Sequence, residues 1–266
     1  MAAALPRGVG IDGSIGPQAV AELAALAESR GYGSFWINIG GREVDAIESL
    51  RLALERTKTI EIASGVFPLD AWPAAGIASR LQAQAMNTPR LIVGVGAGQI
   101  REGVVALTED AIRSIRAAAP QTRVCTAGYG PRIQDAGGRL ADVVLANWMT
   151  PERLDWMTAL VKAGADNAGR AMPPIYLYHR AAAGPDAAAR IRAEMAAYSR
   201  YPVHAKHQSA MGNPNLIGVS ASTPADIDAQ LAPYGDRCRI VLKPLPRDIR
   251  DVAEWRSLIE FFRPAA

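Results

Sequence analysis

Residues 90–100 read RLIVGVGAGQI, an apolar run that passes into three alternating glycines, Gly94, Gly96 and Gly98. The part Leu91–Val95 is short and rich in β-branched residues, which predicts a buried strand that ends in a glycine turn. Two classes of protein place such a turn at the carboxyl end of a strand: dinucleotide-binding sheets, and barrels whose active site lies at that end. Deciding between them decides the fold.

The dinucleotide interpretation fails on spacing. Its fingerprint requires G-x-G-x-x-G, but the third glycine position is occupied by Gln99, and Gly98 comes one residue too early. The motif also follows the fourth expected strand rather than the first. No acidic residue at the end of a strand follows about twenty residues later to bind a ribose. We therefore interpret the turn as the end of a barrel strand.

Short apolar strands alternate with stretches of helical periodicity along the chain, and eight such strands match a (β/α)₈ TIM barrel. A doubly wound sheet is the competing arrangement. No linker rich in serine, proline or glycine divides the chain, so we expect one domain over residues 1–266. The expected strands are Gly8–Ile11, Ser34–Ile39, Ile60–Phe67, Leu91–Val95, Arg123–Ala127, Asp142–Asn147, Ile175–His179 and Arg239–Leu242. The expected helices are Gln18–Arg30, Glu43–Arg56, Pro73–Met86, Glu102–Ala118, Pro131–Gly138, Pro151–Ala163, Asp186–Tyr198, Ile227–Leu231 and Asp248–Phe262.

Charge and composition argue against a nucleic-acid partner and against a membrane-spanning segment. The formal net charge is +3, but the basic residues are scattered and form no run of five, which argues against a nucleic-acid partner. No apolar run reaches the length of a membrane span, and the start of the chain lacks the pattern of a signal peptide. Two distant cysteines, Cys125 and Cys238, indicate neither a disulfide framework nor a metal site. We expect a cytoplasmic protein with a small-molecule substrate.

Small residues recur where the expected strands end, at residues 64–65, 96–98 and 127–130. In a barrel these ends open on one face, where active sites lie. The small residues of these three segments would leave peptide groups exposed to a ligand, and the segments contain no acidic residue. The pattern favours a planar ring system with a phosphate group. A tight turn that contacts no ligand is the alternative for each of these segments.

The segment TIEIASGVFPLDAWPAAGIASRLQAQAMNTPRLIVGVGAG, residues 59–98, resembles the central block of the bacterial-luciferase-like superfamily, whose members use flavin or the deazaflavin coenzyme F420. Three later segments agree with it in order and spacing: VCTAGYGPRIQDAGGRLADVVLANWMTPE, IYLYHRAAAGPDAAARIRAEMAAY and RIVLKPLPRD. The resemblance extends over nearly the whole chain. It implies a luciferase-like TIM barrel, and the short segment 96–122 implies a shortened lid insertion.

The resemblance also implies positions for the cofactor. The peptide bond Gly65–Val66 matches a position where the family often has a cis peptide behind the ring. Two further turns match segments that contact the phosphate side of the cofactor. The cofactor-binding residues implied in this way are Ser64, Gly65, Val66, Gly96, Ala97, Gly98, Gly128, Tyr129 and Gly130.

The chain departs from the family where catalytic groups are expected. Asn38 begins the stretch that carries a polar pair such as Asp-His in several members, and Gln99 occupies a position that is often acidic. An amide does not titrate in the useful range, so no catalytic acid is evident. The remaining catalytic candidates follow other strands or line the expected rim: Asp12 (equally a turn or cap residue), Asn38 and His179. Gln99, Trp148 and Arg180 are expected in the substrate cleft.

His204 and His207 are three residues apart, but without a third ligand we expect a loop or lid rather than a metal site.

The first functional hypothesis is an oxidoreductase that transfers a hydride between F420 and an organic substrate, with the dimer common in the family. The preference for F420 over FMN in this hypothesis rests on the short chain, its RIVLKPLPRD end and its composition. The alternatives are an FMN-dependent monooxygenase, a non-catalytic flavin-binding or F420-binding scaffold barrel, and an unrelated phosphate-binding barrel.

Overall fold

The computed structural model describes residues 7–39, 45–211 and 217–264. Eight parallel strands close into a barrel, because the last of them pairs with both the first and the seventh in chain order. This confirms the (β/α)₈ prediction against the doubly wound sheet, which would leave two open edges. The barrel strands are β1 (Gly8–Asp12), β2 (Ser34–Asn38), β3 (Glu61–Ser64), β5 (Leu91–Gly96), β6 (Arg123–Ala127), β7 (Val143–Asn147), β8 (Ile175–Ala183) and β10 (Arg239–Pro244).

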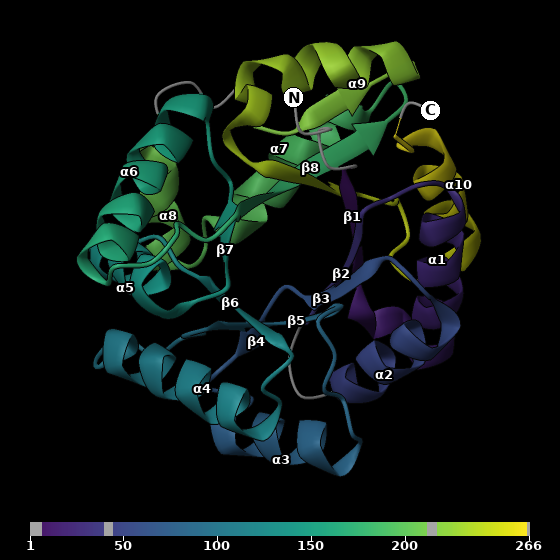
Figure 1. Cartoon of the computed structure of the whole chain (residues 1–266). Helices are drawn as coiled ribbons and strands as arrows, with labels where there is room; N and C mark the ends of the chain where they lie inside the picture. The colour runs from purple at the N-terminus through teal and green to yellow at the C-terminus, as the bar shows by residue number, and fades with distance from the viewer. Residues whose placement is uncertain (1–6, 40–44, 212–216, 265–266) are drawn as a thin grey trace.

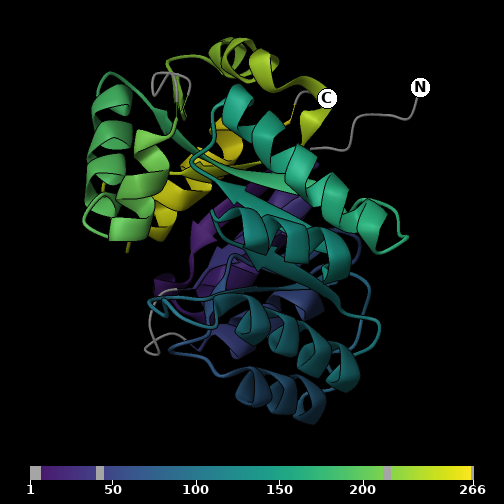
Figure 2. The ribbon, with the colours of Figure 1, turned by 90° about the vertical axis from the view of Figure 1, so that its left-hand side faces the viewer.

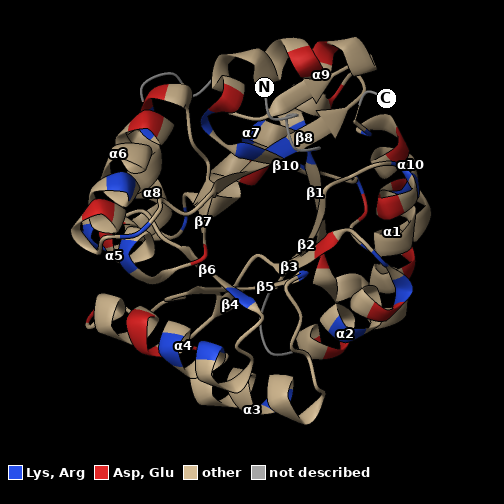
Figure 3. Ribbon diagram, in the orientation of Figure 1, with Lys and Arg blue, Asp and Glu red and all other residues tan. Residues whose placement is uncertain are grey.

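A ring of helices surrounds these strands, and Figure 1 views it with the barrel at the centre. The connections follow the strand–helix alternation read from the sequence. Figure 3 shows acidic and basic residues interspersed over this ring. The helices of the ring are α1 (Pro17–Ser29), α2 (Ala46–Arg56), α3 (Ala74–Ala83), α4 (Val104–Ala118), α5 (Pro131–Leu140), α6 (Pro151–Asn167), α9 (Pro224–Leu231) and α10 (Val252–Phe261).

Alternate residues of each strand divide the hydrophobic core into two layers. On β2, Phe35 and Ile37 pack with the outer helices, whereas Trp36 packs inside the barrel. Tyr176 and Tyr178 of β8 join Trp36 there, with ring centroids at 5.2 and 6.4 Å. The period of two of a β-strand produces this division. The inner layer fills the barrel and leaves space for a ligand only at its end.

One helix and one strand between β8 and β10 were not predicted. Pro202–Ser209 forms helix α8, where we expected a loop, and Val219–Ala221 forms the short strand β9, which pairs with the end of β8. α8 has little amphipathic pattern, so tertiary packing rather than local preference stabilises it. The predicted helix before it is confirmed as α7 (Ala187–Tyr198). In Figure 2 the green helices α7 and α8 lie together at the left of the molecule.

The segment between β5 and β6 is short, as expected, and consists of a loop and α4. The longer connection is residues 184–218, which contains α7 and α8. The predicted start of the second helix at residues 43–44 lies outside the described residues. Within the described ranges, no helix combines the length and the apolar character required to cross a bilayer.

Glu28, near the end of α1, connects this helix to the turn before β3. Its carboxylate accepts hydrogen bonds from the backbone N–H groups of Lys58, Thr59 and Ile60 at 2.9, 2.6 and 2.9 Å. Burial raises the pKa of this carboxyl group, but the backbone hydrogen bonds outweigh burial and lower the pKa from 4.5 to about 2. The ionised carboxylate therefore stabilises the folded state.

Replacing Glu28 by glutamine is expected to lower the free energy of unfolding at pH 7 by about 2 kcal/mol, because charge-assisted hydrogen bonds are lost. The folded-state pKa lies below 4.5, so this contribution is complete above pH 4.5 and disappears as the pH falls toward 2. Urea unfolding of both proteins at pH 7 and pH 3 measures the difference. A difference that does not shrink at pH 3 would contradict the assignment.

Candidate functional site

A cavity of about 880 Å³ opens at the carboxyl ends of β3, β5, β6 and β7. Residues at or just beyond the ends of these strands line it, among them Gly65, Gly96, Ala127 and Asn147. This is the face at which TIM barrels carry their active sites. The cavity lies within the size range of small-molecule and cofactor sites.

The segment after β3 forms one side of the cavity with its backbone. The peptide bond Gly65–Val66 is cis, which confirms the expectation from the family resemblance. Both residues line the cavity, but Ser64 does not. The Ser64 hydroxyl is buried and accepts a hydrogen bond from the Gly94 amide at 2.8 Å. The expected contact of Ser64 with the cofactor is therefore corrected to a supporting role behind Gly65.

Gly94 is required by this arrangement. A Cβ atom on Gly94 would lie 2.2 Å from the Ser64 carbonyl oxygen and 2.8 Å from a methyl carbon of Val66. Only glycine allows β5 to approach the segment after β3 this closely. Gly94 therefore shapes the cavity without lining it.

The loop after β5 contributes Gly96, Ala97, Gly98 and Gln99 to the lining, as predicted. Residues 96–99 include no acidic residue, but an acidic side chain from another segment reaches this loop. The carboxylate of Asp70, just before α3, accepts a hydrogen bond from the backbone N–H group of Gln99 at 2.8 Å. The carboxylate leaves no room for a Cβ atom on Gly98, which also has a positive φ of 62°. Gly98 is thus needed to form the loop itself.

The turn after β6 leads directly into α5. Gly128, Tyr129 and Gly130 line the cavity, as predicted, and Gly130 is the N-cap of the helix. No atom lies within 4 Å of the position that a Cβ atom on Gly130 would take. Helix N-termini attract anions through their free amides and dipole. Two exposed arginines, Arg101 and Arg132, also line the cavity and add positive charge.

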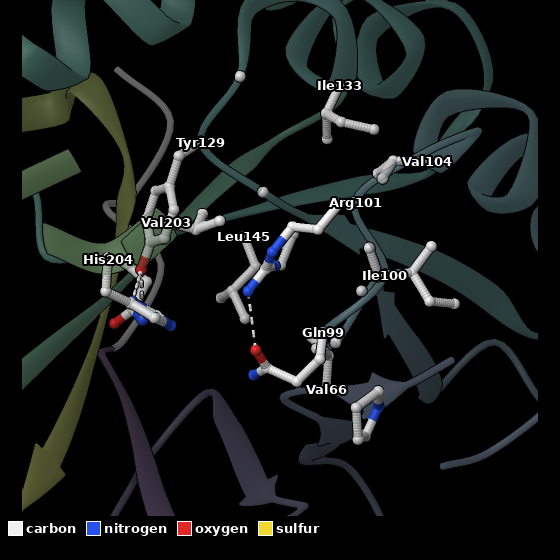
Figure 4. A pocket seen from close by; sticks show the side chains of 18 of the residues that line it. Val66, Gln99, Ile100, Arg101, Val104, Tyr129, Ile133, Leu145, Val203 and His204 are labelled. Carbon is white, nitrogen blue, oxygen red and sulfur yellow. Dashed lines mark hydrogen bonds between the residues drawn. The ribbon is translucent and has the colours of Figure 1, made fainter. Parts of the chain in front are cut away.

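Most of the other side chains that line the cavity are apolar. They come from the segment after β3, from α4 and the loop before it, from α5, from β7 and from α8 (Figure 4). Gln99 also lies here, and its side-chain oxygen accepts a hydrogen bond from Arg101 at 2.8 Å. No aspartate or glutamate is among the described residues of the lining. Among these apolar side chains are Val66, Ile100, Val104, Ile133, Leu145 and Val203.

One wall of the cavity carries a polar group. The Tyr129 hydroxyl lies 2.9 Å from Nδ1 of His204 and accepts a hydrogen bond from the Asn147 amide at 3.1 Å. All three residues line the cavity. His207 stacks on the Tyr129 ring at 3.8 Å and fixes its orientation. Burial raises the pKa of the Tyr129 hydroxyl, so this group is neutral.

Asp12 and Asn38 lie close together at the ends of β1 and β2. Asp12 caps the short helix after β1 by accepting a hydrogen bond from the Ser14 amide at 3.0 Å. The Asn38 amide donates to the Asp12 carboxylate at 3.3 Å. Asn38 lines the cavity, whereas Asp12 does not. The cap interpretation of Asp12 is therefore the one that its contacts support.

His179 does not reach the cavity, which corrects its place among the catalytic candidates. The side chain is 1% exposed, and its Nε2 accepts a hydrogen bond from the Gly218 amide at 3.0 Å. Burial, and secondarily the charge of Arg180, lower its pKa to about 3. His179 is therefore a neutral core residue between β8 and the segment before β9.

Arg180 and Trp148 also lie behind the cavity rather than in the expected substrate cleft. The Arg180 guanidinium is buried, 4.2 Å from the centre of the Trp148 ring, and donates a hydrogen bond to the Asn147 side-chain oxygen. Trp148 is 1% exposed and packs against Met211 and Ile217. Trp148 follows β7, and Arg180 was expected just beyond a strand that ends at His179. β8 instead continues to Ala183, and residues of α7, of α8 and of the segment after α8 pack over these two residues.

Asn147 and His204 were not predicted as site residues. The sequence singled out His204 only through its spacing from His207, as a metal pair that we rejected. Across the described ranges, no group of three or more His, Cys, Asp or Glu side chains is arranged to hold a metal. Recognising His204 requires α8, whose position over the cavity no local signal indicates.

Comparisons with known proteins agree with this geometry. A sequence model of the family described as luciferase-like monooxygenase matches residues 3–105. The coenzyme F420-dependent tetrahydromethanopterin reductase from Methanopyrus kandleri superposes with a TM-score of 0.69 at 14% identity, over 97% of this chain and 100% of that chain. An F420-dependent secondary alcohol dehydrogenase in complex with an F420-acetone adduct superposes with a TM-score of 0.74 at 16% identity, over 97% and 99%.

A third similar structure contains a flavin. The oxygenating constituent of 3,6-diketocamphane monooxygenase from Pseudomonas putida, in complex with FMN, superposes with a TM-score of 0.63 at 13% identity, over 97% of each chain. Structural similarity at these low sequence identities shows that the chain shares the fold of these proteins. The chain therefore has the TIM-barrel fold of these structures, and the match of its residues 3–105 to the luciferase-like family model agrees with the resemblance identified from its sequence.

The described residues fit a flavin or deazaflavin. The cavity is large enough, and one side of it is bare backbone at Gly65, Gly96 and Ala97. Apolar side chains, among them Val66, Ile133 and Leu145, line the same cavity (Figure 4). The N-terminus of α5 and two arginines supply the positive potential that a phosphate requires.

Proposed function

We propose that the protein is an oxidoreductase that binds coenzyme F420 in this cavity and transfers a hydride between the deazaflavin ring and an organic substrate. The observation that carries the proposal is the side of the cavity formed by backbone, from the cis peptide Gly65–Val66 to Gly96 and Ala97. Such a surface suits a planar ring, because no side chain separates the ring from the barrel. An FMN-dependent monooxygenase on the same fold is the alternative.

The chain's own residues would orient the cofactor. Gly128, Gly130 and the first turn of α5 would bind its phosphate, with Arg101 and Arg132 contributing charge. Ile133 and Leu145 would cover the ring and exclude water from it. The bound deazaflavin would supply the carbon that accepts or donates a hydride.

A scaffold barrel without catalysis is the second candidate. The observation that favours it is that the described lining holds no carboxylate, so the acid expected in several members of the family is missing. The polar side chains that remain in the described lining, apart from Gln99 and the two arginines, are Asn38, Tyr129, Asn147, Tyr201 and His204. A scaffold with no cofactor role would bind neither F420 nor FMN, whereas a non-catalytic binding barrel would bind the cofactor without transferring a hydride.

The proposal is tested by titrating the purified protein with F420, FMN and riboflavin while following fluorescence quenching. We expect micromolar binding of F420 and weaker binding of FMN. Riboflavin carries the flavin ring without the phosphate, and we expect it to bind about tenfold more weakly than FMN, because the contacts at α5 are lost. FMN binding tighter than F420 would indicate the monooxygenase alternative, and binding of neither would overturn the proposal.

A further inference from the structure

Helix α8 places His204 on the wall of the cavity, and a chain of hydrogen bonds reaches it from the barrel. The chain starts at Arg180, which donates to the side-chain oxygen of Asn147. A guanidinium is only a donor, so the Asn147 atom that faces it is the oxygen. The Asn147 amide nitrogen therefore faces Tyr129 and donates to its hydroxyl oxygen at 3.1 Å.

This direction of donation determines which nitrogen of His204 carries the proton. The Tyr129 hydroxyl accepts from Asn147 and has one proton of its own, and its other described partner is Nδ1 of His204 at 2.9 Å. Among the described residues, Nδ1 is the acceptor within reach of the hydroxyl proton, so donation from the hydroxyl to Nδ1 satisfies both groups and leaves the proton of the neutral ring on Nε2. Nε2 forms no hydrogen bond with any residue of the described ranges. Figure 4 shows Tyr129 and His204 facing each other at the left of the cavity.

The charges around His204 keep it neutral. Burial, then the positive charges of Arg180, His207 and Arg101, lower its pKa to about 4. The rings that pack on it from α7 and from the start of α8 are those of Tyr198 and Tyr201, with ring centroids at 4.9 and 5.9 Å. No described carboxylate lines the cavity beside it.

We infer that His204 is a catalytic residue that donates a hydrogen bond from Nε2 to the carbonyl oxygen of an uncharged substrate. The inference rests on the proposed function, because it places the substrate between His204 and the cofactor. A neutral imidazole held in one tautomer polarises the carbonyl; hydride addition to the carbonyl carbon leaves an alkoxide, which takes its proton from water at the open mouth of the cavity. Ile133, Leu145 and Val203 give the cavity apolar walls, which suit a ketone or aldehyde better than a charged compound. Tyr129 and Asn147 act through His204 and are positioning residues.

The tautomer is tested on the protein without cofactor. The chain contains three histidines, so nitrogen NMR resolves every imidazole. At pH 7 we expect His204 with a proton on Nε2 and none on Nδ1, and we expect Tyr129→Phe to shift it to a mixture of both tautomers. A His204 that is charged at pH 7, or protonated on Nδ1, would overturn the inference.

The carbonyl contact is tested with cyclohexanone as the probe and F420 at saturation. We expect the Nε2 signal of His204 to shift while the buried His179 signal stays in place. His204→Leu should weaken cyclohexanone binding about tenfold and leave the affinity for F420 within about twofold, because one hydrogen bond to the ketone is lost. His204→Gln keeps a donor and should recover part of the loss. Lys206→Gln, at an exposed position of the same helix, is the matched control and should bind both ligands as the wild type does.

The outcomes separate this inference from the proposed function. Failure of F420 and FMN to bind the wild type would overturn the proposed function and with it the carbonyl contact. Binding of F420 with no response of His204 to cyclohexanone, or with equal cyclohexanone affinity in His204→Leu, would overturn the inference alone.

Discussion

Replacing Gly130 by glutamate is expected to weaken the binding of F420 or FMN by about 100-fold. The new carboxylate would stand at the N-terminus of α5, where we propose that the cofactor phosphate binds, and like charges brought together in an interface cost several kcal/mol. A 100-fold loss corresponds to about 2.7 kcal/mol. Titration of wild type and variant by fluorescence quenching measures the change.

The fold should tolerate this substitution. Gly130 has φ −78° and ψ 149°, which any residue adopts, and the space around its Cβ position is open. A negative charge at a helix N-terminus is itself favourable, so we expect an unchanged or slightly higher Tm. Gly130→Gln, with the same length and no charge, is the matched control and should lose much less affinity. Equal losses for the two variants would show that bulk rather than charge excludes the cofactor.

Gly130 is a better probe than the glycine that the sequence favours. Gly98 also belongs to the expected phosphate-side loop, but its positive φ and its contact with Asp70 mean that any side chain there disturbs the loop. A loss of binding on Gly98→Val would therefore not distinguish a blocked ligand from a displaced loop. Gly130 separates these two effects.

Replacing Gly138 by alanine is expected to lower the free energy of unfolding by about 3 kcal/mol. Gly138 faces α6 so closely that a Cβ atom would lie 2.0 Å from the Val161 carbonyl oxygen and 2.9 Å from the Ala165 amide. Gly164 of α6 approaches α5 in the same way, at 2.2 Å from the Asp135 carbonyl oxygen. Because backbone atoms form these contacts, the two helices must separate to accept one methyl group. Urea unfolding monitored by circular dichroism measures the loss.

Gly76→Ala is the matched control for this prediction. Gly76 lies in α3 and is exposed, with no atom within 4 Å of its Cβ position. Alanine is the better helix former, so this variant is expected to gain about 0.5–1 kcal/mol. The same glycine-to-alanine substitution in two helices should thus change the free energy of unfolding in opposite directions. A Gly138→Ala variant as stable as the wild type would show that α5 and α6 are not held together by this contact.

The tertiary structure assigned the side chains of the site, because their positions depend on contacts between distant segments. Trp148 follows β7, and His179 and Arg180 lie within β8; both strands lead to the active-site face, yet all three side chains are buried. His204 carries no local signal of a site, and it reaches the cavity only because tertiary packing forms α8 over the barrel. The hydrogen-bond chain from Arg180 to His204 joins residues of β8, β7, the turn after β6 and α8, which no sequence spacing relates.

The sequence by itself determined the barrel, its eight strands and the backbone side of the cavity. Strand and helix periodicity are local properties, and a parallel barrel brings every strand end to one face, so the glycines after β3, β5 and β6 could be placed without coordinates. The cis bond at Gly65–Val66 and the lining by Gly96, Gly128 and Gly130 follow from the same reasoning together with the family resemblance. Only the tertiary structure decided which polar side chains meet the ligand, because that depends on how a weakly patterned helix packs across the mouth of the barrel.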